Sequence, residues 1–314
     1  MLSRIAGSLF WIGRYLERAE NISRILEVKL QQFTEDPTVD EQAASASLLG
    51  AMGLELGEHT DELIDGSAVM RYLWYDPDSD SSVRAMIAAM RQSARRIRET
   101  ISPELWEAIN TTFNEIFSSS FTAIRPIASL QLVRLRCVQI AGLASQTMVH
   151  DEAYHFFSLG QSLERVDMTS RLISTVAVEG NNLVAWTRAL RAVGGYHAFT
   201  RTYFGEGDYL DATRFLIVDR RFPHSLVYGL QAVQDSLGEL DPINVKARQD
   251  PTARLVGRTR SRMEYLDTPE LVQGLTARME QVQIACAQVS AELTQRYFAS
   301  TEASIWHWEV MACD

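Results

Sequence analysis

Two charged segments of the sequence carry residues whose types and spacing could support acid–base or ion-binding chemistry. Their ten charged or amide side chains are Arg14, Glu17, Arg18, Glu20, Asn21 and Arg24 in the first segment, and Glu164, Arg165, Asp167 and Arg171 in the second. On a helix, acids and bases three or four residues apart share a face. There they can form ion pairs, bind a charged ligand, or exchange protons with a substrate.

Three interpretations of these segments remain open. In the first, matching segments from two parts of the chain meet as a structural ion-pair network that fixes their register. In the second, they line a polar pocket that binds a ligand or a partner group; an enzyme could draw its acid–base pair there from Glu17, Glu20, Glu164 or Asp167. In the third, the same four carboxylates hold metal ions in a ferritin-like bundle.

The metal interpretation has the least support. Carboxylate-bridged metal sites in helical bundles usually need two Glu-x-x-His elements, and this chain has a single one, from Glu152 to His155. Each acid of the charged segments also has an adjacent arginine, which repels a cation. The sequence contains no Gly-rich phosphate loop, nucleophile elbow or Cys/His pairing. We therefore predict no catalytic residue, no metal ligand and no cofactor.

The two charged segments belong to a longer internal repeat. Residues 10–26 and 157–173 are identical at seven of 17 positions. A second match, in the same order along the chain, pairs residues 72–76 with 215–219 and Ser82-Val83 with Ser225-Leu226. Two matches in the same order and at nearly the same offset, 147 and 143 residues, indicate a duplicated architecture. We predict a single domain over residues 1–314, built from halves at about 1–147 and 148–295 that are related by a pseudo-twofold axis.

Equivalent glycines in the repeat predict how the halves meet. Gly13 and Gly160 occupy the same position in the two copies, and we expect them to mark a close helix–helix approach. In the first helix, apolar residues recur every three or four positions from Ile5 to Phe33, which is typical of a bundle seam. The charged strip lies opposite this seam but also carries Phe10 and Ile25, so we expect another element to cover it.

The whole chain has the composition and periodicity of an all-α protein, and we predict a multi-helix bundle. After a first helix that ends before Pro37, the expected helices cover residues 41–56, 59–74, 82–100, 103–117, 122–149, 151–179, 182–204, 208–217, 224–239, 252–266 and 269–299.

Several residues predict where these helices begin. Ser102-Pro103-Glu104 and Thr268-Pro269-Glu270 have the sequence of helix starts. One of residues 79–81 should cap the helix that follows them, and Pro223 should begin its counterpart in the second half. We expect the aromatic C-terminal tail, residues 300–314, to dock on the body of the protein.

Composition narrows the classes of partner and compartment. The chain has 314 residues and a formal net charge of −10, which disfavours nucleic acid and anionic membranes as partners. Cys137, Cys286 and Cys313 are far apart, so we expect reduced thiols, with the first two as small buried apolar residues. We find neither a signal-peptide core nor a stretch that approaches membrane-spanning length. We expect a cytoplasmic protein.

The opening residues 1–6 and 9–21, together with residues 102–110, 163–165 and 215–219, closely resemble the bacterial alpha-E domain family. The family pattern departs from this chain near residues 79–80 and 90–95. The resemblance implies a genomic association with circularly permuted ATP-grasp and transglutaminase-like proteins, and a role in peptide synthesis or modification. We therefore expect a non-catalytic helical accessory protein with such a protein as its partner; the oligomeric state stays open.

Overall fold

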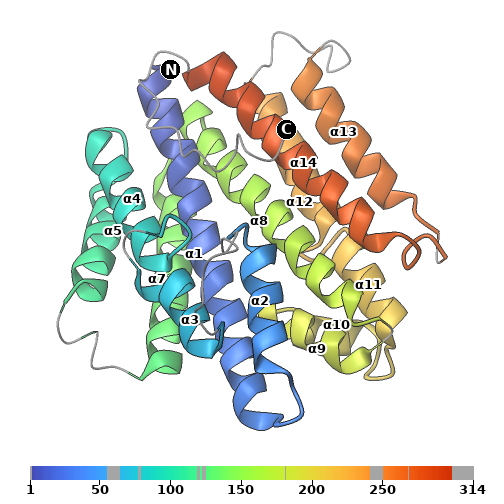
Figure 1. The fold of residues 1–314 in the computed structure, drawn as a ribbon. Helices are drawn as coiled ribbons and strands as arrows, with labels where there is room; N and C mark the ends of the chain where they lie inside the picture. The colour runs from blue at the N-terminus through green and yellow to red at the C-terminus, as the bar shows by residue number, and fades with distance from the viewer. Residues whose placement is uncertain are drawn as a thin grey trace.

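All regular structure in the described part of the chain is helical. The computed structural model describes residues 2–54, 64–76, 79–118, 121, 125–180, 182–240, 250–267 and 269–298. Every element in these ranges is a helix (Figure 1). The prediction of an all-α multi-helix bundle is confirmed for these residues. The expected docking of the tail at 300–314 lies outside them.

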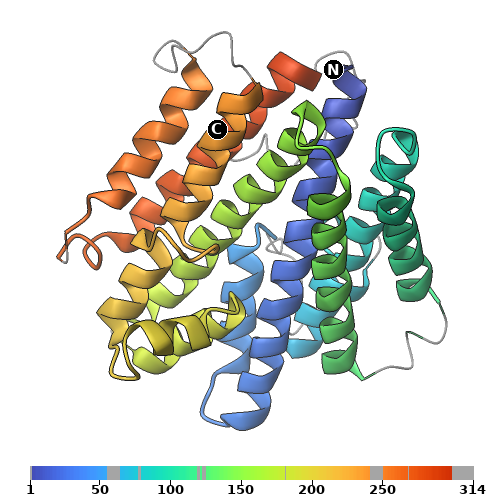
Figure 2. The same cartoon turned by 180° about the vertical axis from the view of Figure 1, so that it is seen from behind.

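Two long helices, α1 (Ser3–Glu35) and α8 (Glu152–Val178), run through the centre of the molecule and pack against each other (Figure 1). On one side, α1 packs against α4 (Val83–Arg96) and α7 (Pro126–Thr147), and α5 (Pro103–Ile116) packs against both of these. Figure 2 shows α7 alongside α1 from behind.

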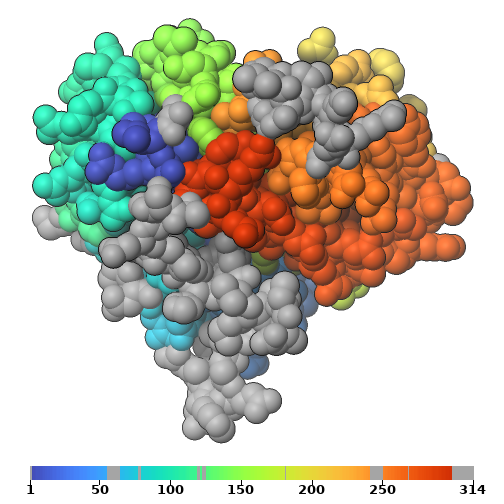
Figure 3. Space-filling model, turned by 90° about the horizontal axis from the view of Figure 1, so that it is seen from above, coloured from blue at the N-terminus to red at the C-terminus, as the bar shows by residue number. Residues whose placement is uncertain are grey.

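The helices on the other side pack around α8 in a corresponding way. Helix α8 contacts α12 (Leu226–Leu240) and α14 (Leu275–Leu293), and α13 (Pro251–Glu264) packs against both. The last short element, η2 (Thr294–Phe298), returns to the start of α1, where the ring of Phe298 lies 5.4 Å from that of Phe10. Figure 3 shows this junction from above, with the start of α1 beside the end of the described chain.

Shorter helices connect the long ones. In the first half they are α2 (Glu41–Ala51), α3 (Gly66–Met70) and η1 (Arg71–Tyr75). In the second half they are α9 (Leu183–Ala192), α10 (Tyr196–Thr202) and α11 (Tyr209–Val218). The first of each set crosses to the opposite central helix, because α2 packs against α8 and α9 packs against α1.

The helix expected over 59–74 lies partly outside the described residues, and its described part begins only at Gly66. Two further expected helices were wrong in extent because glycines interrupt them. Residues 182–204 form two helices, separated at Gly194, whose φ of 67° is left-handed. The helix expected from 269 begins only at Leu275, after Gly274 with φ 66°. Before it, Asp267 and Glu270 exchange backbone-to-carboxylate hydrogen bonds that hold a turn. Left-handed φ angles favour glycine and stop helix propagation.

Two predicted helix starts were also misplaced by a few residues. Ser82, not residues 79–81, caps α4, and its Oγ accepts from the backbone N–H of Ala85. Helix α12 begins at Leu226 rather than Pro223, and the Oγ of Ser225 accepts from the N–H of Tyr228. The capping residues are therefore the two serines that the repeat had paired.

Helix α1 is covered on nearly all sides rather than amphipathic. Its seam residues Leu9, Ile12 and Leu16 are at most 1% exposed, and on the opposite face Phe10 and Glu17 are also fully buried. Helix α8 covers that second face. The expectation that another element would cover the charged strip is confirmed.

Helix α7 departs from the expectation that no segment has membrane-spanning character. By length and composition alone it is long and apolar enough to cross a membrane. In this fold it packs against α1 and α5 through residues that include Leu130, Val133 and Cys137. Its two arginines form ion pairs, Arg134 with Glu27 at 2.6 Å and Arg136 with Glu115 at 2.8 Å.

Candidate functional site at the crossing of the two central helices

The two central helices touch backbone to backbone at a pair of glycines. A Cβ atom added to Gly13 would lie 2.2 Å from the carbonyl oxygen of Phe157, and one added to Gly160 would lie 2.0 Å from that of Phe10. Both distances are far below any van der Waals contact, so this crossing excludes every side chain larger than hydrogen. The predicted close approach is confirmed, and it places the two charged segments next to each other.

Glu17, one turn beyond Gly13, is held by the opposite helix. Its carboxylate is completely buried and accepts from Nε and Nη2 of Arg165, each at 2.7 Å. Asn21 on the same helix donates to it at 3.1 Å. A two-pronged arginine–carboxylate pair of this kind combines charge attraction with fixed geometry.

Glu164 is held in the reciprocal way by α1. It is also completely buried and accepts from Nε of Arg14 at 2.6 Å and from Nε of Arg18. Arg14 reaches further and donates its Nη1 to Ser290 on α14 at 3.0 Å. Each central helix therefore supplies one buried glutamate that is paired with arginine from the other helix.

The outer members of the segments pair within their own helices. Arg24 Nη2 lies 2.7 Å from Glu20, and Arg171 Nε lies 2.8 Å from Asp167. Glu20 and Arg24 are four residues apart, so they form an ion pair on one face of the helix, as that spacing allows. Arg171 also donates to the carbonyl of Ala51 at 3.0 Å and so anchors the end of α2.

The arginine pairs set the charge state of the buried acids. Burial has the largest single effect and raises the pKa of Glu17, but the charge and hydrogen bonds of Arg165, together with His224 and Asn21, leave that pKa below its usual value. For Asp167, burial again has the largest single effect and raises the pKa, but the charges of Arg171, Arg18 and Arg14 and the hydrogen bond from Arg171 together lower it. Glu20 behaves differently, because burial and the nearby charge of Glu17 raise its pKa above the ordinary value. Two ionised carboxylates and one acid with a raised pKa thus share the crossing.

Space beside this network is limited. A cavity of about 20 Å³ borders Arg14, Arg18 and Glu164, which is room for about one water molecule. Within the described residues, no group of three or more His, Cys, Asp or Glu side chains is arranged to hold a metal ion. All ten predicted residues therefore come together, but as a packed network of ion pairs rather than around a ligand-sized space.

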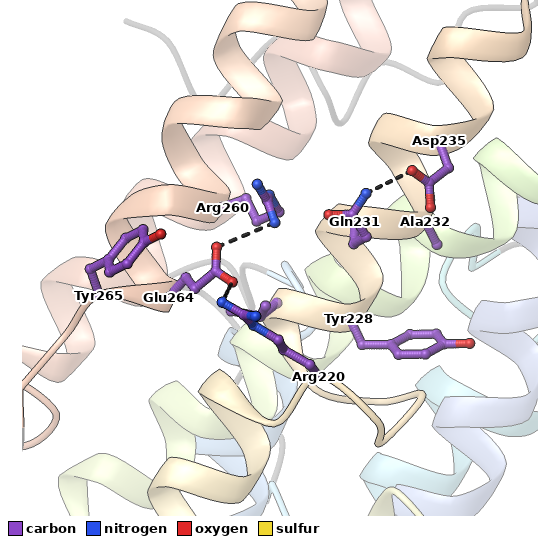
Figure 4. A pocket seen from close by; sticks show the side chains of 9 residues that line it. Arg220, Tyr228, Gln231, Ala232, Asp235, Arg260, Glu264 and Tyr265 are labelled. Atoms are coloured by element: carbon purple, nitrogen blue, oxygen red, sulfur yellow. Dashed lines mark hydrogen bonds and ion pairs between the residues drawn. The ribbon is translucent and has the colours of Figure 1, made fainter.

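Sequence reasoning missed parts of this assembly and a larger cavity elsewhere. His224, Ser290 and the carbonyl of Ala51 approach the network from other elements, and no local pattern in the sequence indicated them. A cavity of about 400 Å³ lies between α12 and α13 (Figure 4). Apart from Arg220, its lining residues lie on α12 and α13 or directly after α13, at the spacing of ordinary amphipathic helices.

Comparisons with known proteins agree with these observations. A model of the Alpha-E family, described as a predicted alpha-helical domain with a conserved ER motif, matches residues 1–298. The chain contains two Glu-Arg dipeptides, Glu17-Arg18 and Glu164-Arg165, and both lie in the network.

Among curated proteins, the uncharacterized proteins Mb2597 of Mycobacterium bovis and Rv2567 of Mycobacterium tuberculosis are each 24% identical over 308 residues. The alignment covers 89% of this chain and 34% of each relative, so the chain spans about a third of their length. No solved structure matches. The match over nearly its whole length shows that the chain belongs to the Alpha-E family.

Proposed function

We propose that this protein is a non-catalytic helical accessory protein in the cytoplasm, which binds a circularly permuted ATP-grasp protein or a transglutaminase-like protein of a peptide synthesis or modification system. The partner class is the one that the family resemblance implies. The single observation that carries the non-catalytic role is that all four acids of the charged segments are buried and paired with arginine.

The pairing argues against acid–base catalysis at the crossing. A general base must lie within hydrogen-bond reach of a substrate proton and have a pKa near the working pH. Glu17 meets neither condition, because Arg165 occupies both of its oxygens and its pKa is lowered. Glu20 has a raised pKa, but one of its oxygens accepts two hydrogen bonds from Arg24.

The network instead has the properties of a structural lock. A buried ion pair adds little net stability compared with apolar residues of similar volume, but removal of only one of its two charges is strongly destabilising. Each half provides charges that only the other half neutralises, so a shifted register would leave buried charges unpaired. In this role the network holds the two halves together as a rigid scaffold, and the outer surface of that scaffold is available to a partner.

We further propose that the two halves are copies related by a pseudo-twofold axis. Three features support this. The helices around α1 and those around α8 pack in the same order. Ser82 and Ser225 occupy equivalent caps. The turns after α2 and α9 both place a left-handed glycine, Gly53 or Gly194, beside the last arginine of a charged segment.

A co-purification experiment tests the accessory role. The tagged protein is mixed, at physiological salt, with a circularly permuted ATP-grasp protein and a transglutaminase-like protein, the two expected neighbours of its gene. An unrelated ATP-grasp ligase serves as the control. The proposal expects stoichiometric recovery of at least one of the two neighbours and none of the control. Recovery of neither neighbour would overturn it.

A further inference from the structure

The cavity of about 400 Å³ between α12 and α13 is the feature that the proposed function leaves unexplained (Figure 4). We infer that it binds a small zwitterionic ligand, with a carboxylate held by Arg220 and Arg260 and an amino group facing Asp235. This inference goes beyond the accessory role and does not depend on it. A volume of this size is within the range of small-molecule sites.

One wall of the cavity is a pair of arginines held in place by a buried acid. Glu264 has a side chain only 5% exposed, and its two oxygens form ion pairs with Arg220 and, at 3.2 Å, with Arg260 Nη1 (Figure 4). An arginine carries five N–H donors, so most donors of both guanidiniums remain for a ligand. Within the described residues, Arg260 Nε is a buried donor that has no acceptor.

The charge of this wall selects an anion. Two guanidinium groups share a single carboxylate, which leaves a net charge of +1 on this side of the cavity. Planar guanidiniums recognise carboxylates by paired hydrogen bonds. Glu264 is thus a positioning residue, while Arg220 and Arg260 are the residues that would contact the ligand.

The opposite wall carries the complementary charge. Asp235 on α12 accepts from Nε2 of Gln231 at 2.6 Å, and both residues line the cavity (Figure 4). Since Asp235 offsets the surplus positive charge of the other wall, the four charged residues sum to zero. A ligand with separated positive and negative groups matches both walls, whereas a simple anion matches only one. Val227 and Ala232 add an apolar part to the lining.

The first half of the chain provides an internal comparison. There the groove between α4 and α5 is filled by Phe113 and Phe117, whose rings stack at 4.4 Å, and the guanidinium of Arg84 lies 4.5 Å from the centre of the Phe117 ring. The burial pattern of α13 matches that of α5 at an offset of 147, which puts Arg260 and Glu264 at the positions of the two phenylalanines. In the second half, Arg260 and Glu264 thus replace the aromatic stack that fills the groove of the first half, and the groove is open and charged.

Ligand-observed NMR and calorimetry on the full chain test the inference. The probes are glycine, glycylglycine and triglycine, in which the distance between the charged ends increases. Their N-acetylated and C-amidated forms each lack one charge, and inorganic phosphate is a simple anion. The expected result is saturable binding of at least one zwitterion, with affinity reduced at least tenfold when either end is capped. Absence of saturable binding, equal binding of the capped forms, or equally tight binding of phosphate would each overturn the inference.

Variants locate the binding site within the protein. Arg220→Gln and Arg260→Gln should each lower the affinity for the zwitterion at least tenfold. Asp235→Asn should also lower that affinity, but it should leave the affinity for the N-acetylated form unchanged. Arg220 is 69% exposed, so its replacement leaves the fold intact. The matched control is Arg258→Gln, at an exposed position of the same helix α13, which should bind like the unaltered chain. Equal weakening by this control would contradict the assignment.

Discussion

Replacing Glu17 by leucine tests whether the crossing of α1 and α8 is held by mutual neutralisation. The carboxylate is completely buried, and the side chain of Arg165 is only 19% exposed. Removing the acid leaves a largely buried guanidinium without its two acceptors. Breaking one partner of such a pair typically costs about 3–5 kcal/mol. We expect that loss for Glu17→Leu.

The expected change in melting temperature follows from the size of the chain. Unfolding entropies scale with length, so a chain of 314 residues loses about 1.5 °C per kcal/mol of destabilisation. The single variant should therefore melt about 5–8 °C lower. The double variant Glu17→Leu with Arg165→Met removes both charges and keeps the volume, so it should recover at least about 2 kcal/mol of the loss.

The assay is urea denaturation followed by circular dichroism, with calorimetry for the melting temperature. Glu115→Gln is the matched control, because its pair with Arg136 leaves each side chain about a third exposed. An exposed pair contributes about 0–1 kcal/mol, so this variant should melt close to the unaltered chain. If Glu17→Leu were as mild as the control, or if the losses at Glu17 and Arg165 simply added, the idea of a reciprocal lock would be wrong.

Three further predictions follow from the same structure. Gly13→Ala should destabilise the protein by about 3 kcal/mol or more in urea denaturation, because the new methyl group meets backbone atoms. The control Gly257→Ala, whose methyl group meets open space, should raise the free energy of unfolding by about 0.5–1 kcal/mol. Similar losses of stability in both variants would refute the close crossing. Burial, followed by the charge of a neighbouring arginine, lowers the pKa of His224 to about 4. The unfolded chain then binds more protons between pH 6.5 and 4, so the free energy of unfolding should fall by about 3 kcal/mol as the pH drops across that window. His224→Phe should flatten this dependence of stability on pH. An unchanged slope in the variant would contradict the pKa shift. Burial also raises the pKa of the Cys137 and Cys286 thiols, so mass spectrometry should find both unmodified by a thiol reagent until the protein unfolds; rapid labelling of the folded chain would count against it.

The charged segments were predictable because their information is local and repeated. Spacing at three and four residues put acids and bases on one face, and the repeat linked Glu17 to Glu164 as equivalents. The sequence could not give the partners across the crossing. Arg14 lies three residues before Glu17, at the spacing of a pair within one helix, but its Nε donates to Glu164 on the other helix. That choice depends on the angle and depth at which two helices meet, which their own sequences do not encode locally.

The predicted extents of helices were wrong where a backbone conformation interrupted a helical side-chain pattern. The run of helix-favouring residues from 182 to 204 continues past Gly194 in the sequence, and only the left-handed φ at that glycine separates α9 from α10. The cavity between α12 and α13 was missed for a different reason. Arg260 and Glu264 look like an ordinary surface pair at i,i+4, and only the neighbouring helix reveals that the side chain of Glu264 is almost fully buried.

The reciprocal lock also has a consequence for how the chain matures on the ribosome. Glu17 and Arg165 are 148 residues apart in the sequence, and chains emerge at about 5–20 residues per second. For roughly 7–30 seconds after α1 appears, Glu17 has no counterpart, because Arg165 is not yet synthesised. The first half therefore waits, incompletely packed, until α8 arrives, and the protein reaches its final form late in translation rather than one half at a time.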